Sequence, residues 1–285
     1  MSINANLHDT LATDPGRRSR AGAGLRARSE MAEGRRLEAE LRAAVSAGEF
    51  LLHYQPRICL RDGAIRGVEA LLRWPHGRRG NTPPATFLPV AERSGLIHEI
   101  GAWVLRTACT EAAQWPGGAV APRISVNIAA AQFEDGAVLR DVAAALEITG
   151  LPPERLELEF TEALLAETDE ETFLALAALR DQGVGLVLDD FGDGLASLLP
   201  LRRLPLTALK LGRTLTRGLP RDPEDLAIAR AIVETGHALG LSVLGAGIET
   251  EAELQALRAI GCDEGQGYLF CRPMAAEPLR ARLAG

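Results

Sequence analysis

The sequence is poor in several features that would place it in common classes of protein. No apolar stretch approaches the ~18 residues that a membrane-spanning helix needs, and the N-terminus lacks the apolar segment of an export signal. The four cysteines, Cys59, Cys109, Cys262 and Cys271, form no C-x-x-C pair, which argues against disulfides and a zinc site. A net charge of −7 argues against DNA or RNA as a partner. We therefore expect a cytoplasmic protein with reduced thiols.

Lysine is the scarcest charged residue of the chain. Lys210 is the single lysine among 31 basic residues, and it lies near the end of the apolar run 206–211. Arginine carries a wide planar group that stays protonated, whereas lysine carries a compact charge whose pKa shifts readily on burial. Lys210 is therefore a candidate for a site that needs an ammonium group, although chance would also put one lysine somewhere.

Two parts of the chain differ in composition. Residues 1–30 are rich in Arg, Gly, Ala and Ser, and we expect a disordered basic tail that is either a solvated leader or a binding arm. Residues 31–285 contain no long linker and no internal repeat, and 47% of the whole chain is hydrophobic, so we predict one folded domain. An apolar stripe that includes Leu37 and Val45 predicts a helix over about 30–47.

Short apolar runs alternate with helical patterns through this domain. The predicted strands are 51–55, 66–72, 123–128, 155–160, 185–189, 208–211, 242–245 and 266–270. The predicted helices include roughly 96–115, 136–148, 169–181, 223–239 and 250–260. This alternation predicts an α/β fold with βαβ units, and the number of strands fits a TIM (β/α)8 barrel. The turn Asp62-Gly63 makes the first two runs a hairpin, so we predict a modified barrel with one antiparallel strand.

TIM barrels place their chemistry at the C-terminal ends of strands. The residues at those predicted ends are Gln55, Glu69 with Arg73, Asn127, Glu159 with Glu162, Asp189 with Asp190, Lys210, Ala246 and Gln266. Carboxylates that converge on one rim would repel each other without a cation. Carboxylate and amide oxygens favour a hard metal such as Mg²⁺ or Mn²⁺. Two adjacent aspartates could hold two ions, an arrangement that suits in-line attack on a phosphodiester.

Each of these residues also has a plainer interpretation. Glu157 and Glu159 alternate with apolar residues, so one face of that strand could be solvated. Asn127 could cap a following helix, and the segment 189–192 could be a turn. Their joint position at the same end of consecutive strands favours a functional site over these separate explanations.

Several specific motifs run through the domain. They are Tyr54-Gln55-Pro56, Glu69-Ala70-Leu71 with Leu72-Arg73-Trp74, Phe87-Leu88-Pro89, Ala91-Glu92, Gly95-Leu96-Ile97, Ser125-Val126-Asn127, Glu159-Phe160-Thr161-Glu162, Asp189-Asp190-Phe191-Gly192, Leu209-Lys210, and Gln266-Gly267-Tyr268-Leu269-Phe270 with Pro273. From about residue 35 to its end, the chain resembles the EAL family of cyclic di-GMP phosphodiesterases.

The resemblance implies a barrel in which two Mg²⁺ or Mn²⁺ ions promote hydrolysis of cyclic di-GMP to linear pGpG. It assigns Glu69, Asn127, Glu159 and Asp189 to the first metal, with Asp189 bridging to a second ion held by Asp190. These metal assignments are expectations carried by the motifs.

The resemblance also assigns roles around the metals. Lys210 matches a lysine that contacts the attacking water, and Gln266 matches a residue that orients a water at the metal. The residues matched to substrate binding are Gln55, Arg73, Leu72, Tyr268 and Pro273, with Arg73 at a phosphate. Glu162 and Glu249 are matched to anchoring the loop after the paired aspartates.

Three departures from the family pattern bear on activity. The glutamate expected to assist the attacking water is Ala246, whose methyl group cannot accept a proton. The aspartate expected two residues after Lys210 is Gly212. The loop after the paired aspartates reads Asp193-Gly194-Leu195-Ala196-Ser197 in place of Thr-Gly-Tyr-Ser-Ser. In the family this loop helps to set metal binding and couples to the dimer interface, so the change affects both expectations.

The sequence leaves three functions open. The first is a degenerate EAL domain that binds cyclic di-GMP and a divalent cation but has lost most or all turnover. The second is an active phosphodiesterase, and Asp193 or Glu264 could then supply a substitute carboxylate. The third is a protein-interaction module that no longer binds the nucleotide. A homodimer and an unidentified protein partner are further expectations.

Overall fold

The computed structural model describes residues 32–77, 80–162, 164, 170–193 and 200–284. The predicted tail over 1–30 and the loop residues 194–197 lie outside the described residues. The described part begins with a helix over 32–47, where the apolar stripe predicted one. Leu37 and Leu41 of this helix are buried in the main apolar core, so the helix packs on the domain through the predicted face.

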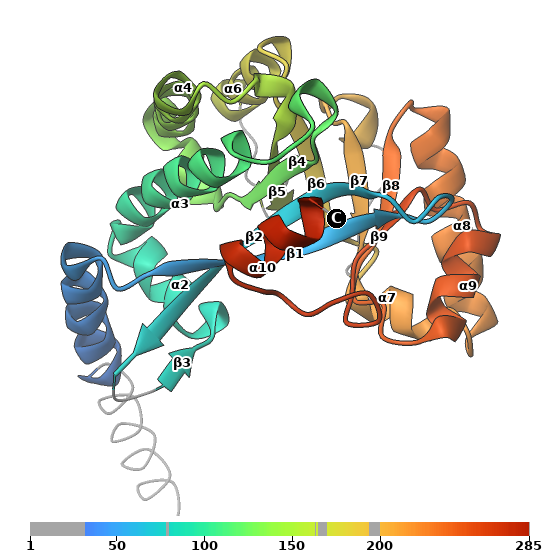
Figure 1. Ribbon diagram of the computed structural model, residues 1–285, viewed down its shortest axis with the longest axis horizontal. Helices are drawn as coiled ribbons and strands as arrows, with labels where there is room; N and C mark the ends of the chain where they lie inside the picture. Colours follow the sequence, from blue (N-terminus) through green and yellow to red (C-terminus); the bar gives the residue numbers. More distant parts are fainter. Residues whose placement is uncertain (1–31, 78–79, 163, 165–169, 194–199, 285) are drawn as a thin grey trace, which may run out of the picture.

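The strands close into a barrel (Figure 1). Their order is β1-β9-β8-β7-β6-β5-β4-β2, and pairing of β1 with β2 closes the circle. The barrel strands are β1 (Leu51–Cys59), β2 (Ile65–His76), β4 (Arg123–Asn127), β5 (Leu156–Thr161), β6 (Gly185–Phe191), β7 (Ala208–Leu211), β8 (Ser242–Gly245) and β9 (Glu264–Gly265). Strand β1 is antiparallel to both β2 and β9, and the other barrel neighbours are parallel. The predicted α/β barrel with one antiparallel strand is confirmed.

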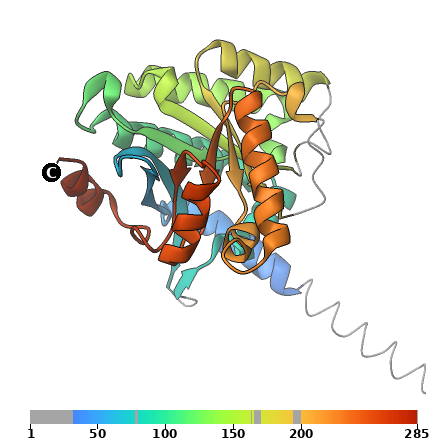
Figure 2. The ribbon, with the colours of Figure 1, turned by 90° about the vertical axis from the view of Figure 1, so that its right-hand side faces the viewer.

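Helices cover the outside of the barrel (Figures 1 and 2), and the predicted ones are present close to their expected ranges. They are α2 (Pro84–Arg93), α3 (Leu96–Ala113), α4 (Ala137–Thr149), α6 (Glu170–Asp181), α7 (Arg213–Gly218), α8 (Pro223–Ala238), α9 (Glu251–Ala259) and α10 (Ala276–Ala284). Short 3-10 turns are η1 (Gly118–Val120), η2 (Ala130–Gly136), η3 (Pro153–Arg155) and η4 (Pro200–Arg202). Strand β3 (Gly80–Thr82) pairs with the end of β2, outside the barrel. None of the described helices combines the length and the hydropathy that crossing a bilayer would require.

The predicted last strand, 266–270, is wrong. Strand β9 ends at Gly265, and the chain turns over residues 267–270. A Cβ atom on Gly267 would lie 2.0 Å from the carbonyl oxygen of Ile248, and the Leu269 N–H donates to that same oxygen at 3.0 Å. The apolar run is typical of a strand, but this close backbone approach, which only glycine permits, makes it a turn.

The inside of the barrel carries charged residues. Glu157 and Glu159 of β5 point inward and are 1% and 0% exposed, while Leu158 and Phe160 join the apolar core on the other face. The solvated-face interpretation of this strand is therefore wrong. The alternation of β5 separates the barrel interior from the layer of helices instead of separating protein from water.

Arg57 of β1 balances these buried carboxylates. It donates a hydrogen bond to Glu157 and places guanidinium nitrogens 3.5 Å from Glu159 and 3.3 Å from Glu264. Arg57 lies opposite Gly67 in the β1–β2 ladder, and a Cβ atom there would meet the guanidinium at 2.2 Å. The glycine thus provides the space that a buried arginine needs.

We expect Arg57→Met to lower the free energy of unfolding by about 3–5 kcal/mol, because three buried carboxylates lose their shared cation. Urea unfolding at neutral pH measures the loss. Arg66→Met is the matched control, because Arg66 pairs with Asp62 at the surface, where an ion pair contributes about 0–1 kcal/mol. Equal losses in the two variants would contradict the role of Arg57.

Candidate functional site

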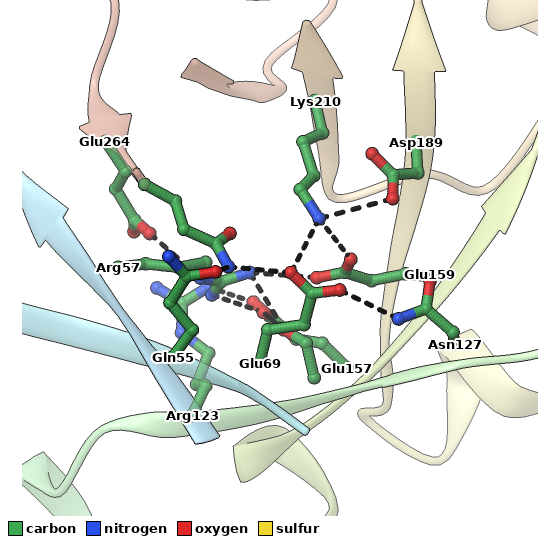
Figure 3. A network of polar contacts seen from close by, with 12 residues as sticks. Gln55, Arg57, Glu69, Arg123, Asn127, Glu157, Glu159, Asp189, Lys210 and Glu264 are labelled. Carbon is green, nitrogen blue, oxygen red and sulfur yellow. Dashed lines mark hydrogen bonds and ion pairs between the residues drawn. The ribbon is translucent and has the colours of Figure 1, made fainter. Parts of the chain in front are cut away.

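Lys210 lies at the centre of a polar network at the C-terminal rim of the barrel (Figure 3). Its Nζ donates to Glu69 Oε2 at 3.0 Å, to Glu159 Oε2 at 2.7 Å and to Asp189 Oδ2 at 3.2 Å. Lys210 is only 4% exposed, and a buried ammonium requires such partners. The single lysine of the chain is therefore a buried cation surrounded by the predicted metal ligands.

Amide side chains hold Glu69 from two sides. Asn127 Nδ2 donates to Glu69 Oε1 at 2.8 Å, and Gln266 Nε2 donates to Glu69 Oε2 at 2.8 Å. Gln266 also donates to Gln55 Oε1 at 3.0 Å, and Gln55 donates to the Cys271 carbonyl at 3.1 Å. Gln55 lies within β1 and not at its C-terminal end, because β1 runs antiparallel and places Gln55 opposite Glu69. Asn127 contacts Glu69 and is not the N-cap residue of η2, which is Ala129, so Asn127 belongs to the network.

Burial and charge shift the protonation of this network. Burial alone lowers the pKa of Lys210, but Asp189, Glu159 and Glu69 outweigh it and hold that pKa well above its ordinary value. Burial raises the pKa of Glu159 despite the attraction of Lys210, and the charges on Glu69 and Asp189 raise it further. Lys210 is consequently a cation at neutral pH and does not act as a proton acceptor.

The network forms part of the wall of a cleft of about 600 Å³. The predicted residues that line this rim cleft are Gln55, Glu69, Asp189, Asp190, Lys210, Ala246, Glu249, Gln266 and Tyr268. Asn127 and Glu159 contact the network without lining the cleft. Ala246 follows β8, and its N–H donates to the carbonyl of Leu211 on β7 at 3.2 Å. Ala246 therefore lines the cleft beside the strand that carries Lys210.

Adjacent Asp189 and Asp190 both line the cleft, although neighbours in a regular strand point to opposite faces. The register between β6 and β7 shifts between Leu188 and Phe191. Asp190 has a φ of 54°, in the left-handed region that aspartate tolerates better than most residues. Its N–H donates to Asp189 Oδ1 at 2.7 Å. This irregularity in β6 brings both carboxylates to one cavity.

Of the other residues matched to substrate binding, only Tyr268 is among those that line the cleft in the described part of the chain. Arg73 is half-buried, and its Nη1 donates to the carbonyl of Leu72 at 2.9 Å. Tyr268 is 49% exposed, and the guanidinium of Arg272 lies 4.5 Å from its ring centroid, which supports the ring through a cation–π contact. Pro273 is half-buried in the same segment. Arg73, Leu72 and Pro273 do not line the cleft among the residues described for it.

The two residues matched to loop anchoring make different contacts. Burial raises the pKa of Glu162, and the backbone N–H of Gly192, in the segment directly after the paired aspartates, acts in the opposite direction. Glu249 pairs with Arg217 of α7, with 2.7 Å between Oε1 and Nη2. Glu162 therefore lies next to the segment after the aspartates, whereas Glu249 joins the β8 side of the cleft to α7.

The candidate substitute carboxylates are engaged elsewhere. Asp193 Oδ2 accepts from the Thr214 N–H at 3.2 Å, and its Oδ1 accepts from the Leu215 N–H at 3.0 Å. Glu264 Oε2 lies 3.3 Å from Arg57 Nε, inside the barrel. Asp193 lines the rim cleft together with Ala246, but both of its oxygens accept hydrogen bonds from α7, and Glu264 is paired with Arg57.

The rim residues fit a divalent cation. Glu69, Glu159 and Asp189 each offer an oxygen within 4.8 Å of the others. Glu159 Oε1 is buried and accepts no hydrogen bond from the described residues, and Arg57 Nη1 lies 3.5 Å from it. Asn127 donates a hydrogen bond to Glu69 through Nδ2, which leaves its amide oxygen as a further ligand atom for a metal ion. A donor set made only of oxygens suits Mg²⁺ or Mn²⁺.

Some residues of the site were missed from the sequence. Arg57 lies 3.5 Å from Glu159, and Arg213, Thr214 and Arg217 line the cleft from α7. The period-2 alternation that links Gln55 to Arg57 on one face of β1 was a usable signal for Arg57. The residues of α7 had no equivalent signal, because their approach to the cleft depends on how the chain folds back after β7.

Fold and site together define a TIM-type barrel protein with a lysine-centred carboxylate cluster and a candidate divalent-cation site at the C-terminal rim. The EAL domain family matches residues 38–273. The chain therefore belongs to the EAL domain family.

Two relatives and a solved structure illustrate this membership. The chain is 42% identical over 246 residues to the bifunctional diguanylate cyclase/cyclic di-GMP phosphodiesterase MucR of Pseudomonas aeruginosa, which covers 86% of this chain and 36% of that protein. It is 41% identical over 239 residues to the cyclic di-GMP phosphodiesterase NbdA of the same species, covering 84% and 30%. A structure of the PaMucR phosphodiesterase in complex with c-di-GMP matches with a TM-score of 0.81 at 42% identity, covering 86% of this chain and 99% of that one. The chain spans about a third of the length of these curated relatives.

Proposed function

We propose that this EAL domain binds cyclic di-GMP and a divalent cation in the rim cleft and hydrolyses the nucleotide far more slowly than an EAL phosphodiesterase with glutamate at position 246. The observation that carries the proposal is the presence of Ala246 in the cleft wall. Around it, the carboxylates, amides and lysine of the rim remain assembled.

Charge balance supports cation binding. Ionised Glu69, Glu159 and Asp189 carry three negative charges around one positive charge on Lys210. Arg57 lies 3.5 Å from Glu159 but is shared with Glu157 and Glu264, so negative charge remains for a divalent cation to balance. When bound, the cation supplies a Lewis acid that polarises a phosphate oxygen and offsets its charge. Lys210 adds a fixed positive charge at the base of the same cleft.

The composition of the cleft supports a nucleotide ligand. Gln55 and Gln266 present amides next to the carboxylates, and the exposed ring of Tyr268 offers a surface on which a base can stack. Arg73 is half-buried near the rim, where a guanidinium suits recognition of a phosphate. A volume of about 600 Å³ lies in the range of small-molecule sites.

Proton transfer is the step that the described residues serve poorly. Attack of water on a phosphodiester needs a group that takes the proton from water. Lys210 is already protonated, and the amide of Gln266 is not a base. Both oxygens of Asp193 accept backbone hydrogen bonds from α7. Loss of general-base assistance lowers a rate by about 10²–10⁴-fold, which is the size of defect we expect.

An active phosphodiesterase is the second candidate, and the intact network favours it. Glu69, Asn127, Glu159 and Asp189 surround Lys210 in one network. A cation held there could itself lower the pKa of a bound water. Direct measurement of turnover decides between the two candidates.

Calorimetric titration with cyclic di-GMP tests the binding half. We expect saturable binding in the presence of Mn²⁺, and we expect Arg73→Met to weaken it about tenfold or more, because a charge-assisted phosphate contact is lost. Arg66→Met is the control, since Arg66 lies near the opposite end of the same strand and pairs with Asp62. Chromatography of the same mixtures for pGpG should give a rate about 100-fold or more below that of the MucR EAL domain assayed alongside.

The outcomes separate the candidates. Binding with turnover close to that of the MucR domain would overturn the reduced-activity proposal and favour the active enzyme. Absence of binding both with Mn²⁺ and with a chelator would overturn both and favour a protein-interaction module.

A further inference from the structure

The helix that follows β7 is capped from a different part of the chain. Helix α7 begins after Gly212, which has no side chain to accept from the first backbone N–H groups. The carboxylate of Asp193, in the segment after β6, accepts from Thr214 at 3.2 Å and from Leu215 at 3.0 Å. One side chain from a neighbouring segment thus does what an N-cap side chain does within most helices.

Positions 193 and 212 compete for one space. A Cβ atom on Gly212 would lie 2.2 Å from Asp193 Cγ and 2.4 Å from each of its carboxylate oxygens. Gly212 has a φ of −63° and a ψ of 157°, a conformation open to any residue. The Asp193 carboxylate, and not the backbone, therefore excludes a side chain at 212. The departures from the family pattern at these two positions form a single exchange of one carboxylate.

The same contact fastens the segment that follows the paired aspartates. The Gly212 N–H donates to the carbonyl of Phe191 at 3.1 Å. The side chain of Asp193 adds the connection to α7. Asp190 lies within this fastened stretch at a φ of 54°, and such a conformation persists where the surrounding structure holds it.

We propose that Asp193 is a positioning residue of the rim cleft. By capping α7 in place of a side chain at position 212, it holds Asp189 and Asp190 in the geometry that binds a divalent cation. Asp193 also lines the cleft, but both of its oxygens accept hydrogen bonds from α7, so we assign its action on the cation to the position of the segment. The inference rests on the proposed function, because its test uses Mn²⁺ binding in the rim cleft. It extends that function by explaining the departures at positions 193 and 212 with one contact, the cap of α7.

A double-mutant cycle tests the exchange. Asp193→Thr removes the cap, and Gly212→Asp forces two carboxylates into one space. We expect each single variant to lower the thermal unfolding midpoint and to weaken Mn²⁺ binding about fivefold or more, the size typical of residues in direct contact. The double variant D193T/G212D moves the carboxylate to position 212, and we expect it to recover both quantities, with Mn²⁺ affinity within about twofold of the parent chain.

A second cap provides the matched control. Asp222 accepts from the Glu224 N–H at 2.8 Å at the start of α8 and does not line the cleft. Asp222→Ala and Asp193→Ala should both lower the unfolding midpoint, but only Asp193→Ala should weaken Mn²⁺ binding. All titrations are run at a temperature where circular dichroism shows each variant folded.

Each result has a defined meaning. If the unfolding midpoint and the Mn²⁺ affinity of the double variant were no higher than those of the more strongly impaired single variant, the exchange would be overturned. Unchanged Mn²⁺ affinity in Asp193→Ala, or an equal loss in Asp222→Ala, would overturn the positioning role. Absence of Mn²⁺ binding by the parent chain would contradict the proposed function instead, and the unfolding midpoints would still decide whether positions 193 and 212 exchange the cap.

Discussion

We expect the Ala246→Glu variant to hydrolyse cyclic di-GMP at least tenfold faster than the parent chain. Ala246 lines the cleft beside β7, which carries Lys210, so a longer side chain there extends into a cavity of about 600 Å³ and not into packed protein. A carboxylate at this position restores a proton acceptor, and general-base assistance contributes about 10²–10⁴-fold to a rate. Initial rates of pGpG formation with Mn²⁺ and with Mg²⁺ measure the gain.

The matched control for this gain is Ala246→Gln. Glutamine has nearly the same size and polarity as glutamate but cannot take a proton, so it should leave the rate close to that of the parent chain. An equal gain in both variants would point to hydration or packing of the cleft and not to proton transfer. No gain in Ala246→Glu would mean that the missing carboxylate is not what limits turnover.

The second large effect is expected from Glu159→Gln, which should weaken Mn²⁺ binding about 100-fold or more. Changes in groups that merely support metal ligands already cost about 10–100-fold in affinity, and Glu159 offers an oxygen within 4.8 Å of oxygens of Glu69 and Asp189. Calorimetric titration with Mn²⁺ measures this loss.

Folding stability should respond in the opposite sense. Burial raises the pKa of Glu159, which means that the folded chain accepts a neutral side chain at 159 more readily than a charged one. Above the pH range in which Glu159 ionises, the charge therefore opposes folding. Without metal, the free energy of unfolding of Glu159→Gln at pH 8 should be no lower than that of the parent chain.

Glu157→Gln on the same strand is the control, because we expect it to change stability and not Mn²⁺ affinity. Burial raises the pKa of Glu157, but Arg57 and Arg123 outweigh it and hold that pKa below its ordinary value. Its charge is thus stabilising, and removing it leaves Arg57 with fewer partners. We expect Glu157→Gln to be less stable than the parent chain and to keep its Mn²⁺ affinity. Loss of Mn²⁺ affinity in both variants alike would contradict a cation site at Glu159.

Much of the fold could be predicted from local pattern. Strand and helix periods are properties of neighbouring residues, and so the barrel, the β1–β2 hairpin and the helices α3, α4, α6, α8 and α9 were expected close to where they lie. The exception, the run 266–270, has strand-like composition but turns at Gly267, because the backbone of Ile248 approaches too closely for any side chain. That approach joins segments that are distant in the sequence, and no local pattern reports it.

The candidate site divides in the same way. The residue types at the strand ends were visible in the sequence, because parallel strands bring their C-terminal ends to one rim. The placement of Asp190 was not visible, since it depends on a register shift against β7 and a positive φ. Nor could the sequence tell whether Glu157 and Glu159 faced water or the barrel, because alternation alone does not say which side is wet.

The sequence by itself determined the barrel, the family and the set of chemical groups at the rim, including the alanine at 246 and the glycine at 212. The tertiary structure decided how those groups are used. It placed Lys210 among three carboxylates and Arg57 beneath them. It also directed the carboxylate of Asp193 to the first N–H groups of the helix after Gly212. The reason is that hydrogen bonds and ion pairs form or fail with differences of a few tenths of an ångström in the distance between their atoms. Those atoms lie on segments far apart in the chain, and closing the barrel sets the distances between them.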